Sequence, residues 1–563
     1  ERIMSKSSIS SESLPKEPTS KRLKADIPSN SDLGAFPNYF TTPGYGTGAP
    51  PKCILEQQVQ KLSSTLRCKP SWWTKIKNEE IVNRWKSETV EQGLTNEQFE
   101  FVMQQLDYLA GQFDGDVRVS SVDGVYESNE RISSKIRERL LKGVAILENV
   151  PEKDKDWHPG SDNLVLDLVH PSLYCLVNGV SKIVGESDRG KPLKEVMGSG
   201  RSICDDEFMK MCPVIGQEAI SRSFVSHRFQ WLPSDVMVDK NGNARFVSYV
   251  NNLHPEDHDE LIATIEDVLS CFIPLFDKVL TLMKQPWENV VKVDCDWWDP
   301  SEPNYDSEED DEEQYEQWEE TRQLKEQQLP NTFPAPKPFD EPVHLRGRKI
   351  QIITKMANIV LTPDKPVYPG GSWHVEGMAN EHIVASGIYY YHSENITESK
   401  LEFRQAVCEP DYEQGDNEGV RRTYNLHDND ELNQSMGHTI CRENKCVCFP
   451  NTLQHRVAPF ELVNKAEPGV RKILVFFLVD PTKEVWSTAA VPPQQRAWFK
   501  KGGTMENLCL PDSILDVIED HLDFPLTLER AKKYREELMA ERKWFVQHHN
   551  EDIFERPFSL CEH

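Results

Sequence analysis

The chain has 563 residues and a formal net charge of −28, from 64 basic and 92 acidic side chains. This acidic balance disfavours non-specific binding to DNA, RNA or anionic lipid, and no basic patch stands out in the sequence. No apolar run reaches the ~18 to 20 residues that a membrane span needs, so no membrane partner is expected. The 13 cysteines are irregularly spaced behind an N-terminus without an apolar signal-peptide core, which predicts an intracellular protein, cytoplasmic or nuclear.

The first part of the chain is predicted to be helical behind a polar tail. Residues 1–45 are rich in Ser, Pro, Lys and Gly with few large apolar groups, a composition that predicts a disordered tail. Within residues 46–219, apolar positions such as Phe99 and Val102 recur at helical spacing, which predicts a mostly helical N-terminal region. Residues 484–563 return to helical spacing and are expected to form a helical C-terminal region.

Residues 220–483 have β-type patterns instead. The Asp-Lys-Asn-Gly sequence at 239–242 lies between β-prone runs and predicts a hairpin, and residues 258–283 predict an amphipathic helix that covers one face of a sheet. Residues 301–345 form an acidic, proline-rich insertion, interpreted as a solvated segment that could alternatively dock a basic protein partner. Short strand-like runs follow at close intervals, at 350–361, 383–391, 401–407, 446–449, 454–462 and 471–479.

These runs predict the fold class. Close-set strands without intervening helices indicate a sandwich or barrel, so we expect an α+β protein with a double-stranded β-helix core of the jelly-roll or cupin type, flanked by helical regions.

Three residues in the β region form a candidate metal site. His374 and Glu376 are separated by one residue in the run Gly370-Gly-Ser-Trp-His-Val-Glu-Gly, so their side chains point the same way on a strand. A second histidine, His455, follows in the run Phe449-Pro-Asn-Thr-Leu-Gln-His-Arg-Val. Two histidines and one carboxylate occupy one face of an octahedron and leave three positions free, which is the arrangement of non-heme iron(II) oxygenases. A structural zinc site would use four ligands instead.

Arg471 is the candidate anchor for an anion. It opens the apolar run Arg-Lys-Ile-Leu-Val-Phe-Phe-Leu-Val, and strand alternation places it on the same face as every second hydrophobic residue of that run. A cation in such a row needs an anionic partner. Because a guanidinium can donate two parallel hydrogen bonds to a carboxylate, Arg471 suits the distal carboxylate of 2-oxoglutarate.

The order of these motifs resembles that of double-stranded β-helix oxygenases that use iron(II) and 2-oxoglutarate. The resemblance implies that His374, Glu376 and His455 form the catalytic metal triad, with Glu where Asp is commoner, and that Arg471 binds the cosubstrate. Over nearly the whole chain past the tail, the sequence resembles more closely a large fungal family defined by a domain of unknown function, number 4246. The runs that carry this second resemblance are Phe229-Gln-Trp-Leu-Pro, Ser248-Tyr-Val-Asn-Asn-Leu-His-Pro, Gly370-Gly-Ser-Trp-His-Val-Glu-Gly-Met, Ile388-Tyr-Tyr-Tyr, Phe449-Pro-Asn-Thr-Leu-Gln-His-Arg-Val and Val491-Pro-Pro-Gln-Gln.

Other side chains compete for the cosubstrate. Lys400 and Arg404 lie on the strand where Jumonji-like oxygenases place a cosubstrate lysine, so they rival Arg471. Asn358 and Lys355, on the strand before the triad, could reach the same cosubstrate, and Asn358 is expected to bind it. The tyrosines at 389–391 alternate between two faces, and aromatic packing is their expected role.

Together these patterns predict an iron(II)/2-oxoglutarate-dependent dioxygenase. Its cofactors would be Fe(II), 2-oxoglutarate and O2, and it would hydroxylate a small molecule or a protein while 2-oxoglutarate is decarboxylated to succinate. One alternative is a noncatalytic scaffold that binds a protein partner on the same fold. Another is a cupin-like zinc or manganese enzyme that uses no 2-oxoglutarate. The complete ligand set argues against the scaffold, and Arg471 argues against both.

Overall fold

The structure is a computed structural model that describes residues 30–40, 48–210, 224–293, 297–299, 310–412, 416–501 and 524–560. Most of the tail expected at residues 1–45 lies outside these ranges. Its described part, residues 30–40, begins with the short helix η1 (Asn30–Leu33) and buries the side chains of Phe36 and Phe40 against the rest of the protein.

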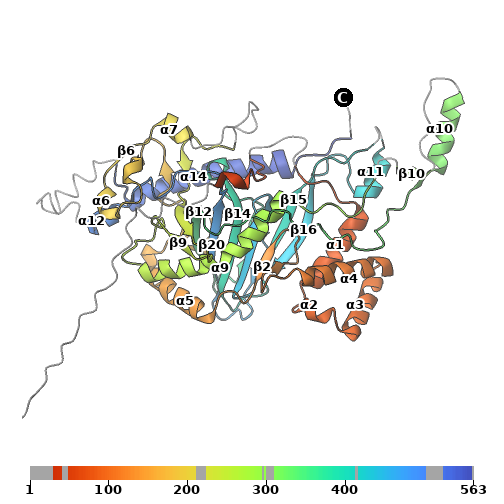
Figure 1. Cartoon of the computed structure of the whole chain (residues 1–563), viewed down its shortest axis with the longest axis horizontal. Helices are drawn as coiled ribbons and strands as arrows, with labels where there is room; N and C mark the ends of the chain where they lie inside the picture. The colour runs from red at the N-terminus through yellow and green to blue at the C-terminus, as the bar shows by residue number, and fades with distance from the viewer. Residues whose placement is uncertain are drawn as a thin grey trace, which may run out of the picture.

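A large antiparallel sheet forms the centre of the molecule (Figure 1). Its strand order is β1-β2-β17-β14-β20-β12-β8-β9, and β3 also pairs with β12. The strands are β1 (Arg118–Val119), β2 (Tyr126–Ser128), β3 (Val165–Val169), β8 (Ser234–Val238), β9 (Ala244–Phe246), β12 (Lys349–Leu361), β14 (Ile383–Glu394), β17 (Lys445–Pro450) and β20 (Gly469–Val479).

A smaller antiparallel sheet packs against one face of the large sheet. It contains β16 (Asn433–Ile440), β15 (Lys400–Ala406) and β18 (Leu453–Val457), in that order. Side chains from both sheets meet in one buried cluster, which includes Val475 and Phe477 of β20 and Leu401 and Phe403 of β15. We call the side of the large sheet that faces this cluster the inner face.

Strand alternation assigns each side chain of the large sheet to one of its two faces. Ile353 and Phe477 are partners in register and belong to the inner-face cluster. Met356 and Leu474 are also partners, but they belong to the cluster on the opposite face. We call this opposite side the outer face.

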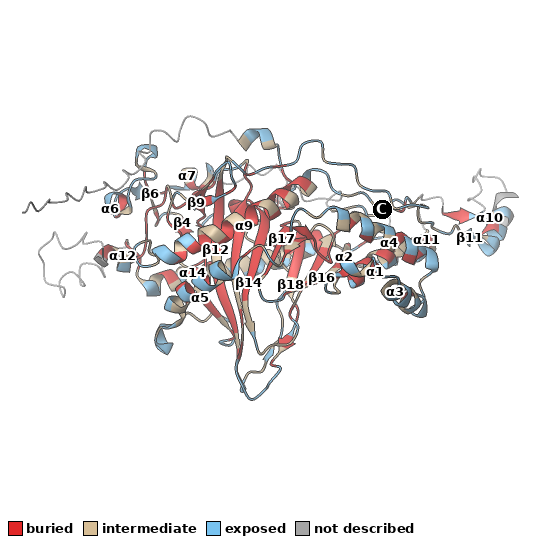
Figure 2. Ribbon diagram, turned by 60° about the horizontal axis from the view of Figure 1, so that its bottom comes forward, coloured by how far each residue is buried: buried red, intermediate tan, exposed pale blue. Residues whose placement is uncertain are grey.

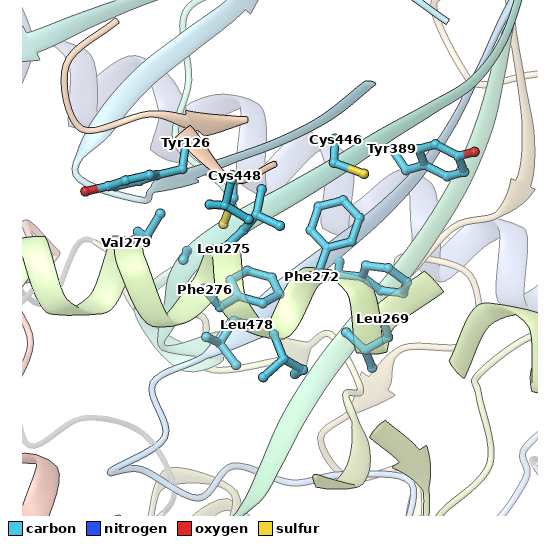
Figure 3. Close-up of a cluster of buried hydrophobic side chains, with 14 of the residues drawn as sticks. Tyr126, Leu269, Phe272, Leu275, Phe276, Val279, Tyr389, Cys446, Cys448 and Leu478 are labelled. Carbon is cyan, nitrogen blue, oxygen red and sulfur yellow. The ribbon is translucent and has the colours of Figure 1, made fainter. Parts of the chain in front are cut away.

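Helix α9 (Asp259–Lys284) covers the outer face, as the amphipathic pattern of residues 258–283 predicts. Figure 3 shows its apolar side chains, among them Phe272 and Phe276, against residues of the sheet. The approach is close at Gly387 of β14, where an added Cβ would lie 2.6 Å from the ring of Phe272. Helix α5 (Ser134–Glu148) packs beside α9.

The remaining elements surround the two sheets. Figure 2 shows that the central strands are buried, whereas the outlying helices expose one side. The elements are α1 (Ile54–Arg67), α2 (Trp72–Lys75), α3 (Glu79–Glu91), α4 (Asn96–Gly111), η2 (Glu152–Asp154), β4 (Leu176–Val177), β5 (Lys182–Ile183), η3 (Glu186–Asp188), α6 (Leu193–Val196), β6 (Arg201–Ser202), α7 (Asp205–Lys210), β7 (Phe229–Gln230), β10 (Trp298–Asp299), α10 (Asp310–Thr321), β11 (Gln323–Leu324), β13 (Val367–Tyr368), η4 (Ala379–Glu381), α11 (Asn417–Tyr424), β19 (Phe460–Glu461), α12 (Arg496–Lys501), α14 (Leu528–His549) and η6 (Asn550–Phe554).

The predicted α+β class with antiparallel sheets is confirmed, with three differences in detail. Strands β1, β2 and β3 come from the region expected to be mostly helical and join the large sheet, so this sheet extends before residue 220. The acidic insertion contains helix α10 and buries the side chain of Trp318. Strand β16 was not expected. In the part of the chain that the structure describes, no helix is long and apolar enough to cross a membrane.

Candidate metal centre

His374, Glu376 and His455 converge at the edge of the small sheet. His374 and His455 pair as an antiparallel bridge, with backbone N···O distances of 3.2 and 3.0 Å, and their ring centroids are 4.5 Å apart. Glu376 lies two residues after His374, so its carboxylate reaches the same point. The structure therefore brings together the three residues that the sequence predicts as metal ligands.

The distances between the three side chains fit a metal ion better than a hydrogen-bonded cluster. Oε1 of Glu376 lies 3.7 Å from Nε2 of His374 and 3.4 Å from Nε2 of His455. Two ligands held about 2.0–2.2 Å from one ion at near-octahedral or tetrahedral angles are separated by roughly 3.0–3.6 Å. Hydrogen bonds of this type are shorter, at about 2.7–2.9 Å. The 3.4 Å separation falls within the range for two ligands of one ion and the 3.7 Å separation lies just above it, and the ligand atoms of all three residues lie within 4.8 Å of one another.

The hydrogen bond of one imidazole and the packing of the other also favour ligation. Nδ1 of His374 lies 2.8 Å from the carbonyl oxygen of Ser372, to which it must donate, so Nε2 keeps its lone pair for a metal. His455 is 3% exposed and packs between Phe403 and Phe449. Both features hold an imidazole in the orientation that a ligand needs.

The electrostatics of the metal-free site make His374 the most basic side chain of the triad. Burial alone would raise the pKa of Glu376, but its interactions with the two histidines hold that pKa well below the usual value. Burial lowers the pKa of His455. For His374, the lowering effect of burial is outweighed by Glu376 and Ser372, so the pKa is raised. In the metal-free protein, His374 is therefore the member of the triad that binds a proton most strongly.

Asn451 positions Glu376 and was not predicted from the sequence. Its Oδ1 accepts the backbone N–H of Glu376 at 2.8 Å, and its Nδ2 donates to the carbonyl oxygens of Glu376 and Ile383 at 3.0 and 3.1 Å. Asn451 thereby fixes the chain on both sides of the loop that carries the carboxylate. The feature of the sequence that could have indicated this role is the position of Asn451 in the Phe449-Pro-Asn run, four residues before His455.

Arg471 lies on the inner face of β20 and is 2% exposed. Its Nη1 donates to Oγ of Ser399 at 2.6 Å, and its guanidinium carbon lies 5.0 Å from the ring centroid of Tyr390 and 5.6 Å from that of Phe460. Nε of Arg471 has no hydrogen-bond partner, and among the described residues no carboxylate lies within ion-pair distance of the guanidinium. A buried cation without an anionic partner is costly, so Arg471 is suited to bind an anion.

The structure places Asn358 away from the metal centre, which corrects its expected role in cosubstrate binding. Asn358 pairs in register with Lys472, and both side chains lie on the outer face, where Nδ2 of Asn358 donates to Glu148 at 2.6 Å. Asn358 and Arg471 lie on neighbouring strands but on opposite faces. Lys355 lies three residues before Asn358 on the same strand, so alternation places its side chain on the inner face, where its partner in register is Val475.

Lys400 and Arg404 also point away from the inner face. Leu401 and Phe403 of the same strand belong to the inner-face cluster, so alternation turns Lys400 and Arg404 outward. Arg404 is bound to Glu555 and to Gln454, and Lys400 pairs with Glu398. Neither side chain is available to anchor a cosubstrate beside the triad.

His158, Asp167 and His170 form a second group with metal-ligand residue types. Its hydrogen bonds oppose metal binding, in contrast to those of the triad. The backbone N–H of Ser172 donates to Nδ1 of His170 at 3.2 Å, so the neutral imidazole carries its proton on Nε2. Nδ1 of His158 donates to Oδ2 of Asp167 at 2.8 Å. We interpret this group as a hydrogen-bonded cluster.

Helix α14 covers the metal centre from the His374 side. Arg542 of this helix pairs with Glu381, and its guanidinium carbon lies 3.7 Å from the ring centroid of Trp231. Oε2 of Glu381 accepts the backbone N–H of Met378 at 2.7 Å, so this pair ties α14 to the loop after Glu376. A cavity between the helix and the centre is lined by Phe40, Phe224, His374, Val375, Gly377, Met378, Arg542, Phe545, Val546, His549 and Asn550.

Comparison with known proteins places the chain in a family. Residues 96–502, well over half of the chain, match the family model described as "Protein of unknown function (DUF4246)". The chain belongs to this family. Residues 16–88 match the separate N-terminal domain described for the same family, "Domain of unknown function DUF4246, N-terminal". No curated protein matches the chain.

Two solved structures show weak similarity. One is a bsmA homologue from Methylobium petroleophilum PM1, with 10% sequence identity, a TM-score of 0.17, and coverage of 25% of this chain and 45% of that one. The other is the Fe(II)/α-ketoglutarate-dependent dioxygenase TqaL, with 10% identity, a TM-score of 0.21, and coverage of 63% and 95%. At these TM-scores neither similarity bears on the function.

Metal affinity at this centre is expected to rise about tenfold per pH unit until the pH exceeds the raised pKa of His374, and then to level off. Below the raised pKa of His374 this imidazole holds a proton, whereas the pKa values of Glu376 and His455 are lowered, so metal binding in that pH range displaces one proton. Calorimetric titration of Mn²⁺ in buffers with different heats of ionisation measures that proton. Release of no proton, or of two, would contradict this assignment.

Proposed function

We propose that this protein is an iron(II)- and 2-oxoglutarate-dependent oxygenase that hydroxylates its substrate. The proposal rests above all on Arg471, a buried guanidinium on the inner face that has no acidic partner among the described residues. A scaffold has no use for such a cation, and a cupin-like metalloenzyme without a dianionic cosubstrate leaves it without a counter-charge. The triad of His374, Glu376 and His455 supplies the metal site to which the same cosubstrate would bind.

The strand order supports a double-stranded β-helix as the core. Strands β17, β14, β20 and β12 are consecutive in the large sheet, and β16, β15 and β18 are consecutive in the small one. The bridge between His374 and His455 adds a fourth position beside β18. Two four-stranded antiparallel sheets that enclose a cluster of apolar side chains make up a jelly roll.

Each residue of the centre then has a defined task. His374, Glu376 and His455 would hold the metal on one side, while the Ser372 carbonyl and Asn451 fix the orientation of the ligands. Arg471 would bind the distal carboxylate of 2-oxoglutarate, with Ser399 holding the guanidinium in place. Iron(II), with 2-oxoglutarate and O2, supplies the oxidation of a C–H bond and yields succinate and carbon dioxide.

Water must be limited at such a centre, and apolar side chains shield part of it. Phe403 and Phe449 pack against His455, and helix α14 with Phe40 covers the side of His374. A dry surrounding strengthens the charge interactions of Arg471 and Glu376 and limits uncoupled oxidation.

The proposed function predicts a spectroscopic signal. Protein loaded with iron(II) without oxygen should develop a weak metal-to-ligand absorption band in the visible range when 2-oxoglutarate is added, and should form succinate when oxygen is admitted. If iron is bound but neither the band nor succinate appears, the scaffold or the cupin-like alternative is the better account. Succinate without 2-oxoglutarate loss would point to a contaminating activity.

A further inference from the structure

Lys355 is an accessible cation on the inner face of the large sheet. Its partners on that face are buried, with exposed fractions of 1% for Ile353 and 3% each for Ala357 and Val475. Lys355 itself is partly exposed, as are Ile473 of β20 and the metal ligand His374. The inner face is therefore open to solvent at Lys355, on the side where the metal centre lies.

The ammonium group of Lys355 has no hydrogen bond or ion pair with any residue that the structure describes. Other lysines of the sheet differ in this respect. Lys349, on the same strand, pairs with Asp235 at 2.7 Å, and Lys472 pairs with Glu148 at 2.7 Å. A partly buried ammonium with three donors and no acceptor is suited to bind an anionic ligand.

Lys355 lies within electrostatic range of both the metal centre and the cluster of His158, Asp167 and His170. Its positive charge acts on both groups. Burial is the main reason that the pKa of His170 is lowered to about 3, and the charge of Lys355 acts in the same direction. The charge also works against protonation of His374 and His455, after the larger effects of burial and of Glu376.

Asp167 does not neutralise Lys355 directly. Oδ2 of Asp167 accepts from His158, Oδ1 is buried without a partner, and neither oxygen lies within ion-pair distance of Lys355. In the loaded centre the charges of iron(II) and Arg471 are balanced by Glu376 and the two carboxylates of 2-oxoglutarate. Lys355 is then left with only the longer-range attraction of the Asp167 carboxylate, without an ion-pair partner among the described residues.

We propose that Lys355 binds an oxyanion of the substrate, a carboxylate or a phosphoryl group, beside the metal centre. This inference rests on the proposed function because it calls the bound ligand a substrate. Anion binding at Lys355 can be tested independently of that function. A charge-assisted hydrogen bond of this kind changes binding by roughly ten- to hundredfold. The substrate is thus a molecule or side chain that carries an oxyanion near the C–H bond to be oxidised.

The test uses Mn²⁺-loaded protein saturated with 2-oxoglutarate. Acetate and methylphosphonate are added separately, and the relaxation of their ¹³C and ³¹P signals by Mn²⁺ reports binding near the metal. We expect at least one of these probes to bind close to Mn²⁺ in the wild type and to bind about tenfold or more weakly in Lys355→Met. The probe that binds better distinguishes a carboxylate from a phosphoryl substrate.

Two further variants complete the design. Lys365→Met removes the charge of an exposed lysine that pairs with Asp162, and it should leave probe binding unchanged. Lys355→Arg should retain most of the probe binding. The proposal is overturned if Lys355→Met binds the probes as the wild type does, or if it loses 2-oxoglutarate, which would make Lys355 a cosubstrate contact. If 2-oxoglutarate does not bind the wild type, the proposed function fails. The anion site is then still tested by comparing probe binding to the Arg471→Ala variant with probe binding to the Lys355→Met variant.

Discussion

Replacing His374, Glu376 or His455 by alanine is expected to lower iron(II) affinity by about 100-fold or more while leaving the two sheets folded. Loss of a residue that merely supports a ligand costs about 10- to 100-fold, so loss of a ligand itself should cost at least the upper value. The fold should survive because His374 and Glu376 are partly exposed and the packing of the sheets does not depend on them. His455 is buried, so His455→Gln is a second variant that fills more of the imidazole's volume than alanine does.

Metal titration with a competing chelator measures this affinity, and circular dichroism checks the fold. His392→Ala is the matched control. His392 also lies near carboxylates, 3.1 Å from Glu443 and 3.3 Å from Glu394, but it belongs to neither three-residue group of metal-ligand types. Wild-type affinity in a well-folded His374→Ala or Glu376→Ala variant would remove that residue from the centre.

The grouping of the triad could be predicted from the sequence because it depends on local geometry. A histidine and a carboxylate one residue apart share a side of the chain, and His455 lies in a strand-like run that ends beside them. Arg471 could be predicted for the same reason, since it begins an apolar run whose alternate residues face the core. The assignment of these residues to iron stays a prediction.

The place of Asn358 could not be predicted. Strand β12 is buried on both faces over most of its length, so its hydrophobic pattern does not reveal which parity points inward. The choice depends on register, because Ile359 rather than Asn358 is the partner of Arg471. Lys355 lies four residues before Ile359 on the same strand, so its side chain is on the inner face, as that of Arg471 is. It is the accessible cation on this face of the strand.

Long-range pairing explains the other differences. Strands β1 and β2 are two and three residues long, and they join the large sheet only because β2 pairs with β17, more than three hundred residues later. Strand β16 reads Asn-Gln-Ser-Met-Gly-His-Thr-Ile, with few β-prone residues, and pairing with β15 holds it in place. Tertiary contacts therefore decide these elements against a weak local preference.

Arg471→Ala is expected to leave metal affinity nearly unchanged and to weaken 2-oxoglutarate binding by about two to three orders of magnitude. A buried carboxylate that loses a bidentate charged partner loses ~3 to 4 kcal/mol. Isothermal titration of 2-oxoglutarate into Mn²⁺-loaded protein measures the loss, with succinate as a control ligand. Arg471→Lys should restore only part of the affinity, because an ammonium is a point charge and cannot form two parallel bonds.

The matched control for Arg471 is Arg404→Ala, which removes another buried guanidinium that is already bound to Glu555 and Gln454 on the outer side of the small sheet. It should alter stability but leave 2-oxoglutarate affinity in the remaining folded protein as in the wild type. Arg471→Met preserves more of the buried volume if the alanine variant is unstable. If Arg471→Met binds 2-oxoglutarate as tightly as the wild type, the guanidinium is not the anchor. Because Arg471 is the observation on which the proposed function depends most, that result would remove its main support.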